Sequence, residues 1–340
     1  AMALANRLGA PVITITTGDT LQINLTNGLP IVPTSLTIVG QLGGGLGTTT
    51  STPSPTHAPQ ELTWPVNGDS SAGDPVNRPV PQGPRVQSFS TEVAAGAATA
   101  LTWTALRPGT YLLESGTHPS IQGPMGLFGM VVVTAAPAGT TAGTAYPGVT
   151  YNADIPLLLS EIDPVQNAAV ARAVTLTGFS ETTVWSGQPG GCGHPATANS
   201  GNCYPPAVNY APLYYLINGV AFDKSRSGAS LFPTAPATGV SGTVLVRIVN
   251  AGLRMHVPSI VGAQTGAAVP GFGLIAEDGN PLPGVTRVQS EVFLAAGKTY
   301  DVMLNVPASG PALPIFDRAL GLSGNATARD AGMLAYIGVN

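Results

Sequence analysis

Short extended segments broken by glycine and proline are the sequence feature that most constrains this chain. Residues 11–27 alternate apolar and polar side chains around Gly18-Asp19, which is typical of a β-hairpin with one half-buried face. Comparable segments follow roughly every 8–15 residues, and only residues 164–174 have a helical pattern. This spacing favours an all-β fold built from β-sandwiches.

The length of 340 residues is enough for two hydrophobic cores. The sequence predicts a first domain over residues 1–136, a small-residue linker over 137–148, and a second domain over 149–340. Residues 40–84 form a long stretch rich in Gly, Thr, Ser and Pro within the first domain. The strands predicted after the first hairpin cover residues 34–39, 85–93, 99–104, 109–113, 126–134, 155–159, 213–222, 242–250, 255–261, 273–276, 288–294, 300–306 and 333–339.

Charge is scarce in this chain. Charged residues make up 9% of the sequence, against roughly 25% in an ordinary globular protein. The net charge is −4, and the 13 basic residues are spread thinly, so we expect no nucleic-acid partner. No apolar run reaches the roughly 20 residues that cross a bilayer, so no transmembrane segment is expected.

The two cysteines lie close together in a segment rich in Pro, Gly and Asn. Cys192 and Cys203 stand within an insertion predicted at about residues 186–212, and a disulfide is the simplest interpretation. The alternative is a metal site formed by Cys192, His194 and Cys203, although a structural zinc site takes four ligands. A disulfide predicts an oxidising compartment, so the expected location is secreted, periplasmic or on the cell surface.

Seven short motifs occur in a fixed order along the chain: GDT at 18–20, PGTY at 108–111 with GLFG at 126–129, DIPL at 154–157, LING at 216–219, VRIVNAG at 246–252, EDG at 277–279 and AGKTYD at 296–301. In this order they resemble the multicopper oxidases, the family of laccases and ascorbate oxidases. The resemblance covers nearly the whole chain. It implies two tandem cupredoxin-like Greek-key β-sandwich domains, equivalent to the first two domains of that family.

The resemblance also brings an expectation that this sequence does not meet. Members of the family bind copper through His-X-His pairs at the ends of two strands of the first domain. The matching positions here hold Thr37 and Val39 in one strand, and Glu114 and Gly116 in the other. Copper in such sites takes imidazole nitrogen, so we expect no trinuclear copper cluster of the family's kind.

The type 1 copper of three-domain members lies in a third domain, where its Cys stands between two ligand histidines. No His-Cys-His triplet occurs in these 340 residues. Two interpretations follow: the chain is a fragment, or the third domain is absent or supplied by another chain.

A few residues remain as weak metal candidates. His118 follows the Glu114 position, and Met125 and Met130 lie downstream, so a soft Cu(I) site is conceivable. The alternative is that His118 is a polar loop residue and both methionines pack in the core. His57, His194 and His256 stand in three other segments and make no cluster. The N-glycosylation sequons at Asn24 and Asn325 depend on the host.

Three functional hypotheses result. The first is a degenerate multicopper-oxidase-like scaffold, adhesion or assembly module with no cofactor, whose partners are other proteins or further copies of itself. The second is the first two domains of a secreted copper-dependent oxidase, whose copper lies in a third domain or a partner chain. The third is a copper-handling protein that uses His118 with Met125 and Met130. The sequence favours a role other than catalysis and identifies no small-molecule substrate.

Overall fold

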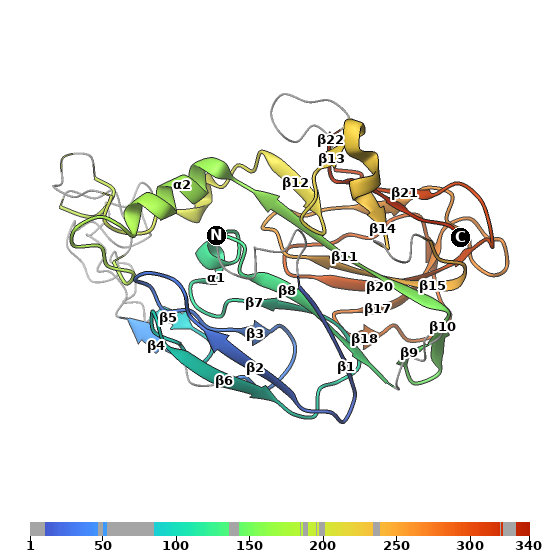
Figure 1. The fold of residues 1–340 in the computed structure, drawn as a ribbon, viewed down its shortest axis with the longest axis horizontal. Coiled ribbons are helices and arrows are strands. Elements are labelled where there is room, and N and C mark those ends of the chain that lie inside the picture. The colour runs from blue at the N-terminus through green and yellow to red at the C-terminus, as the bar shows by residue number, and fades with distance from the viewer. Residues whose placement is uncertain are drawn as a thin grey trace, which may run out of the picture.

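The computed structural model describes residues 11–46, 50–52, 85–135, 143–183, 185, 190–194, 196, 201–233, 239–319, 321 and 331–340. Within these ranges the fold is almost entirely β, as predicted (Figure 1). Residue 57, the second sequon at 325 and most of the 40–84 stretch lie outside the described residues. In the described part, no helix has the length and apolar character needed to span a membrane.

The N-terminal part of the chain forms one four-stranded sheet and two strand pairs. The sheet has the order β1-β8-β7-β3, in which β1 is parallel to β8 and the other pairings are antiparallel. The strands are β1 (Val12–Thr16), β8 (Phe128–Thr134), β7 (Gly109–Glu114) and β3 (Thr37–Ile38), with β2 (Leu21–Thr26) paired to β6 (Ala98–Trp103) and β4 (Thr50–Thr52) paired to β5 (Arg85–Ser88). Their shared core contains Trp103, Tyr111 and Val131.

The C-terminal part contains a seven-stranded sheet and a four-stranded sheet around a second, larger core. The larger sheet contains β12 (Tyr214–Ile217), β11 (Ala153–Ile162), β15 (Gly242–Asn250), β20 (Thr299–Val306), β17 (Phe272–Glu277), β18 (Asn280–Pro281) and β19 (Val288–Gln289). The smaller sheet contains β14 (Leu231–Phe232), β23 (Leu334–Ile337), β21 (Leu313–Asp317) and β16 (Pro258–Ile260), and β13 (Phe222–Asp223) pairs with β22 (Ala331–Gly332).

Two α-helices accompany the strands in the described part of the chain. The first, α1 (Pro119–Gln122), is one turn between β7 and β8 that the sequence did not predict. The second, α2 (Pro164–Ala173), confirms the helix expected at 164–174. Asp163 caps it by accepting from the amides of Val165 and Gln166, both at 2.9 Å, and Pro164 fits its first turn. Two short 3-10 helices cover Ala207–Asn209 and Lys224–Ser230.

Several predicted segments differ from the structure. The strands predicted at 288–294, 255–261 and 85–93 are shorter, as β19, β16 and β5. Residues 143–148 of the predicted linker belong to a hairpin of β9 (Gly143–Tyr146) and β10 (Val149–Tyr151), whose buried side chains join a small cluster with β15 and β17. The strand predicted at 34–39 is paired in the sheet only at Thr37–Ile38. The chain changes partner there, because Thr34 bridges to Val93 while Thr37 pairs with Glu114. The division into two domains stays a prediction.

Side chains on the two faces of β7 contact different parts of the chain. Tyr111 and Leu113 enter the N-terminal core, whereas Leu112 belongs to a separate buried cluster with residues of the C-terminal part. In this cluster, Leu112, Met130 and Val132 meet Leu158, Val249 and Ala251. Side chains alternate between the two faces of β7 and β8. One face therefore packs in the N-terminal core, and the other packs against the C-terminal part in the cluster around Leu112, here called the apolar seam.

Next to the apolar seam lies a buried guanidinium. Arg247 of β15 is 0% exposed and donates to Asp154 Oδ2 at 2.7 Å and to Thr110 Oγ1 at 3.1 Å. Its Nη1 is 3.7 Å from Asp301 Oδ2, and Thr110 Oγ1 donates to Asp301 Oδ1 at 2.6 Å. Burial alone would lower the pKa of Arg247, but Asp301 and Asp154 raise it, so the cation persists. This network crosses between β7 and the large sheet.

We expect Arg247→Met to lower the free energy of unfolding by about 3–5 kcal/mol, because Asp301 would be left buried without its cation. Urea unfolding followed by near-ultraviolet circular dichroism measures the change. Arg226→Met is the matched control, since Arg226 pairs with Asp223 at 3.1 Å with 80% of its own side chain exposed. Equal effects of the two substitutions would contradict the role assigned to Arg247.

Candidate functional site

The turn between β7 and β8 gathers several of the residues that the sequence marks as candidates. Glu114 ends β7, and His118 directly precedes α1. His118 has a left-handed backbone with φ of 44°, an uncommon conformation for a residue other than glycine. Ser115 closes the turn by donating its amide to Leu127 O at 3.1 Å. The backbone conformation of His118 and this hydrogen bond therefore fix the path of the chain through the turn.

Buried hydroxyl and amide groups hold this turn in place through hydrogen bonds. Gln122 Oε1 accepts from Ser115 Oγ at 2.6 Å and from Thr34 Oγ1 at 2.8 Å, and its Nε2 donates to Pro33 O at 2.8 Å. Thr117 Oγ1 lies 2.9 Å from Ser35 Oγ. These groups are neutral and bonded to one another, so they position the turn and supply no charge to it.

The four positions that the family resemblance assigns to copper ligands lie along the pairing of β3 with β7. Thr37 is opposite Glu114, and Val39 donates its amide to Leu112 O at 2.8 Å. A Cβ at Gly116 would lie 2.7 Å from Thr37 Cγ2, so a larger side chain has no room there unless Thr37 moves. Burial raises the pKa of Glu114 to about 7, so this carboxyl changes charge near neutral pH.

His118 faces the insertion of the C-terminal part. Its Nε2 is 3.9 Å from Glu181 Oε2, and its ring meets Tyr204 edge-on with centroids 5.2 Å apart. Burial lowers the pKa of His118, which favours the neutral imidazole. Burial raises the pKa of Tyr204, whose ring also contacts Phe179 at 5.3 Å.

The two methionines proposed as partners of His118 have different surroundings. Met130 is fully buried in the apolar seam between the two parts of the chain. Met125 lines a small apolar cavity of about 90 Å³, between α1 and α2, together with Val170 and Tyr204. His118 is not among the residues that line this cavity. The geometry therefore gives no support to a site shared by the three residues.

The remaining histidines and the cysteines are accounted for within the described residues. Cys192 and Cys203 form the predicted disulfide, so the alternative metal site with His194 is wrong. His194 Nδ1 accepts from the Ala196 amide at 3.3 Å. His256 is 1% exposed and pairs with two buried carboxylates, a cluster that the sequence did not reveal because its members are far apart in the chain.

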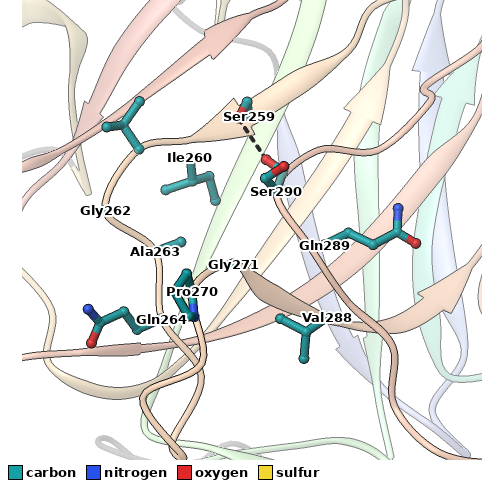
Figure 2. Close-up of a pocket in the computed structure, with 11 residues that line it drawn as sticks. Ser259, Ile260, Gly262, Ala263, Gln264, Pro270, Gly271, Val288, Gln289 and Ser290 are labelled. Atoms are coloured by element: carbon teal, nitrogen blue, oxygen red, sulfur yellow. Dashed lines mark hydrogen bonds between the residues drawn. The ribbon is translucent and has the colours of Figure 1, made fainter.

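A second hollow lies in the C-terminal part between β16 and β19 (Figure 2). It is an open groove with a volume of about 620 Å³, and its wall includes a hydrogen bond of 2.6 Å from Ser259 Oγ to Ser290 O. Gln264 and Gln289 lie on opposite sides of it in Figure 2. Charged side chains are missing from its lining in the described part of the chain, and none of its residues comes from the turn after β7.

Comparison with solved structures identifies the fold. The chain aligns over 97% of its length with a blue copper oxidase from Nitrosomonas europaea, with a TM-score of 0.56 and 18% identity. It aligns equally far with the multicopper oxidase mgLAC (0.54, 14%) and with Fet3p, a multicopper oxidase that functions in iron import (0.52, 16%). No family model and no curated protein matches the sequence. The predicted cupredoxin-type fold of the multicopper oxidases is thus confirmed as a fold.

The chain is shorter than these structures. It spans 76% of the Nitrosomonas protein and 77% of mgLAC, but only 46% of Fet3p. The expectation that no cofactor is involved is wrong on these findings, because a fold shared with several copper oxidases points to copper.

The residues at the positions matched to the family's ligands, at the ends of β3 and β7, do not fit that copper. Thr37, Val39 and Gly116 offer a hydroxyl, two methyls and a hydrogen where imidazole nitrogen is required. In the described part of the chain, no group of three or more His, Cys, Asp and Glu side chains is placed to hold a metal ion. The copper to which the fold points is therefore not assigned to these positions.

We expect Glu114→Gln to stabilise the protein at pH 8 and to leave it unchanged at pH 4. The folded pKa of about 7 lies above the ordinary value of 4.5, so ionised Glu114 costs folding free energy increasingly from pH 4.5 to pH 7. The gain at pH 8 should be about 3 kcal/mol, measured by urea unfolding at both pH values. The same gain at pH 4 and pH 8 would show that packing, not charge, is responsible.

Proposed function

We propose that this chain forms the first two sandwich domains of a secreted or periplasmic copper-dependent oxidase. In this proposal the copper is held by a third domain or a partner chain, and the two sandwiches supply the platform to which that unit attaches. The observation that carries the proposal is the match of 97% of the chain to copper oxidases that extend beyond the aligned part.

The disulfide supports the location. Cys192 and Cys203 are bonded across a surface insertion, and such bonds persist in oxidising compartments. The scarcity of charge supports attachment to another protein unit, since few charges would have to be desolvated when two surfaces meet. Large apolar side chains on the surface, such as Leu42 at 84% exposure and Val208 at 87%, are consistent with such contacts.

A second candidate is a scaffold, adhesion or assembly module with the same fold. The packing of Gly116 against Thr37 is in keeping with it, because a side chain at position 116 would meet Thr37 and the family's ligand is absent there. The two candidates differ in whether the natural assembly carries out copper-dependent oxidation.

The test compares the chain of residues 1–340 with the protein as it is isolated from its source, including any further domain or co-purifying subunit. Both are loaded with copper and dialysed, then assayed for metal content and for oxygen-dependent oxidation of a dye. We expect stoichiometric copper and oxidation only in the natural form. A natural form that assembles but neither binds copper nor oxidises the dye would favour the scaffold instead.

His118→Ala and His194→Ala are a matched pair for the same assay. Neither substitution should change the copper content of the 1–340 chain, because His118 faces Glu181 and Tyr204 and not a cluster of ligands. Stoichiometric copper that is lost only in His118→Ala would contradict the proposal and support a copper-handling protein.

A further inference from the structure

Residues 201–213 form a segment, here called the strap, that runs along the C-terminal part and reaches the turn after β7. The disulfide of Cys203 and the contacts of Asn202 hold one end, since Asn202 O accepts from the Ser180 amide at 3.1 Å and Asn202 Nδ2 donates to Gly178 O at 3.0 Å. At the other end, the Leu213 amide donates to Ile162 O at 3.0 Å.

Between its ends the strap covers the candidate site. Tyr204 lines the apolar cavity between α1 and α2 and lies edge-on to His118. Removing the strap would therefore open this cavity and the side of His118 that Tyr204 covers.

The strap is fastened in its second half by two carboxylates: Asp163 Oδ2 accepts from the Ala211 amide at 2.7 Å, and the buried Glu161, at the end of β11, binds Tyr210. Tyr210 OH donates to Glu161 Oε2 at 2.8 Å, and Tyr210 is only 7% exposed. Tyr210 O accepts from Arg254 Nη2 at 2.7 Å. Glu161 also accepts from the amides of Leu253 at 3.0 Å and Arg254 at 3.2 Å, so one side chain joins the strap to the loop after β15.

Glu161 is in turn paired with His256. The two ring nitrogens of His256 contact two different carboxylates, Nε2 with Glu161 Oε1 and Nδ1 with Asp317 Oδ2, the latter at 2.9 Å. Asp317 also accepts from the Val257 amide at 2.8 Å. All three side chains are at most 1% exposed, so a single cation separates two anions in the interior.

We propose that Glu161, His256 and Asp317 form a latch that holds the strap over the apolar cavity while His256 is protonated and releases it when His256 loses its proton. In the neutral state, one imidazole N–H can serve only one of the two carboxylates, and the two buried anions then repel each other. The strands themselves are held by backbone ladders, so the strap is the part that opens.

The pH range follows from the surroundings of His256. Burial alone would lower its pKa, but the hydrogen bonds to Asp317 and Glu161, together with their charges, raise it to about 9. Of the other groups nearby, Tyr215 lies edge-on at 6.1 Å and Tyr210 donates to Glu161. The stabilisation is complete below the ordinary pKa of 6.5, declines above it, and is lost as pH rises through 9.

Hydrogen exchange of the 1–340 chain tests the latch, with rates corrected for the intrinsic effect of pH. Between pH 7.5 and pH 10 we expect protection of the strap to fall about tenfold or more, while β15 keeps its protection. His256→Gln should show low strap protection already at pH 7.5, without further pH dependence. His194→Gln is the control and should behave as the wild type.

Tyr210→Phe keeps the test decisive if His256→Gln does not fold. It removes the strap's hydrogen bond to Glu161 but leaves the three charged groups in place. We expect lower strap protection at pH 7.5, with a further fall toward pH 10 that follows the pH dependence of the wild type. Wild-type strap protection that is constant up to pH 10, or that is lost together with that of β15, would overturn the proposal.

Discussion

The arrangement of the molecule depends on one buried guanidinium and the apolar seam beside it. Arg247 lies in the middle of β15, and its charge is matched by Asp154 and Asp301 and contacted by Thr110. An unpaired charge at this depth would be costly, so the network holds only when β7 and the large sheet are in one register. The seam around Leu112 and Val249 supplies the apolar contact between the two parts of the chain. The polar network around Arg247 fixes the alignment of β7 against the large sheet.

The turn after β7 inherits its position from this seam. Thr110 and Leu112 of β7 face the C-terminal part. Glu114, two residues further on, ends the same strand, and burial raises its pKa there. From the other side, the insertion brings Tyr204 against His118. The place where the family resemblance locates copper ligands therefore lies beside a turn that the protein's own contacts hold in position.

Much of the fold could be predicted from the sequence because its signals are local. The strand predicted at 109–113 and the helix predicted at 164–174 each depend on neighbouring residues, and both lie close to the bounds of β7 and α2. The single turn of α1 is too short for a period, and it is stabilised by Gln122 contacts to distant segments. The strand at Thr37 was overestimated because its change of partner leaves no mark in the sequence.

The candidate site was less predictable for the same reason. Four positions could be matched to the family by motif order, but the latch of Glu161, His256 and Asp317 joins residues from three separate segments. No spacing rule connects them. Arg247 did carry a signal, since a charged residue within the apolar run VRIVN requires a buried partner, although the sequence alone does not say which one.

Anomalous diffraction at the copper edge, from crystals of the natural copper-loaded assembly, tests the central claim most directly. The account predicts copper peaks in the unit attached to the two sandwiches and none beside the turn that contains Glu114 and His118. A copper peak coordinated by that turn would contradict it.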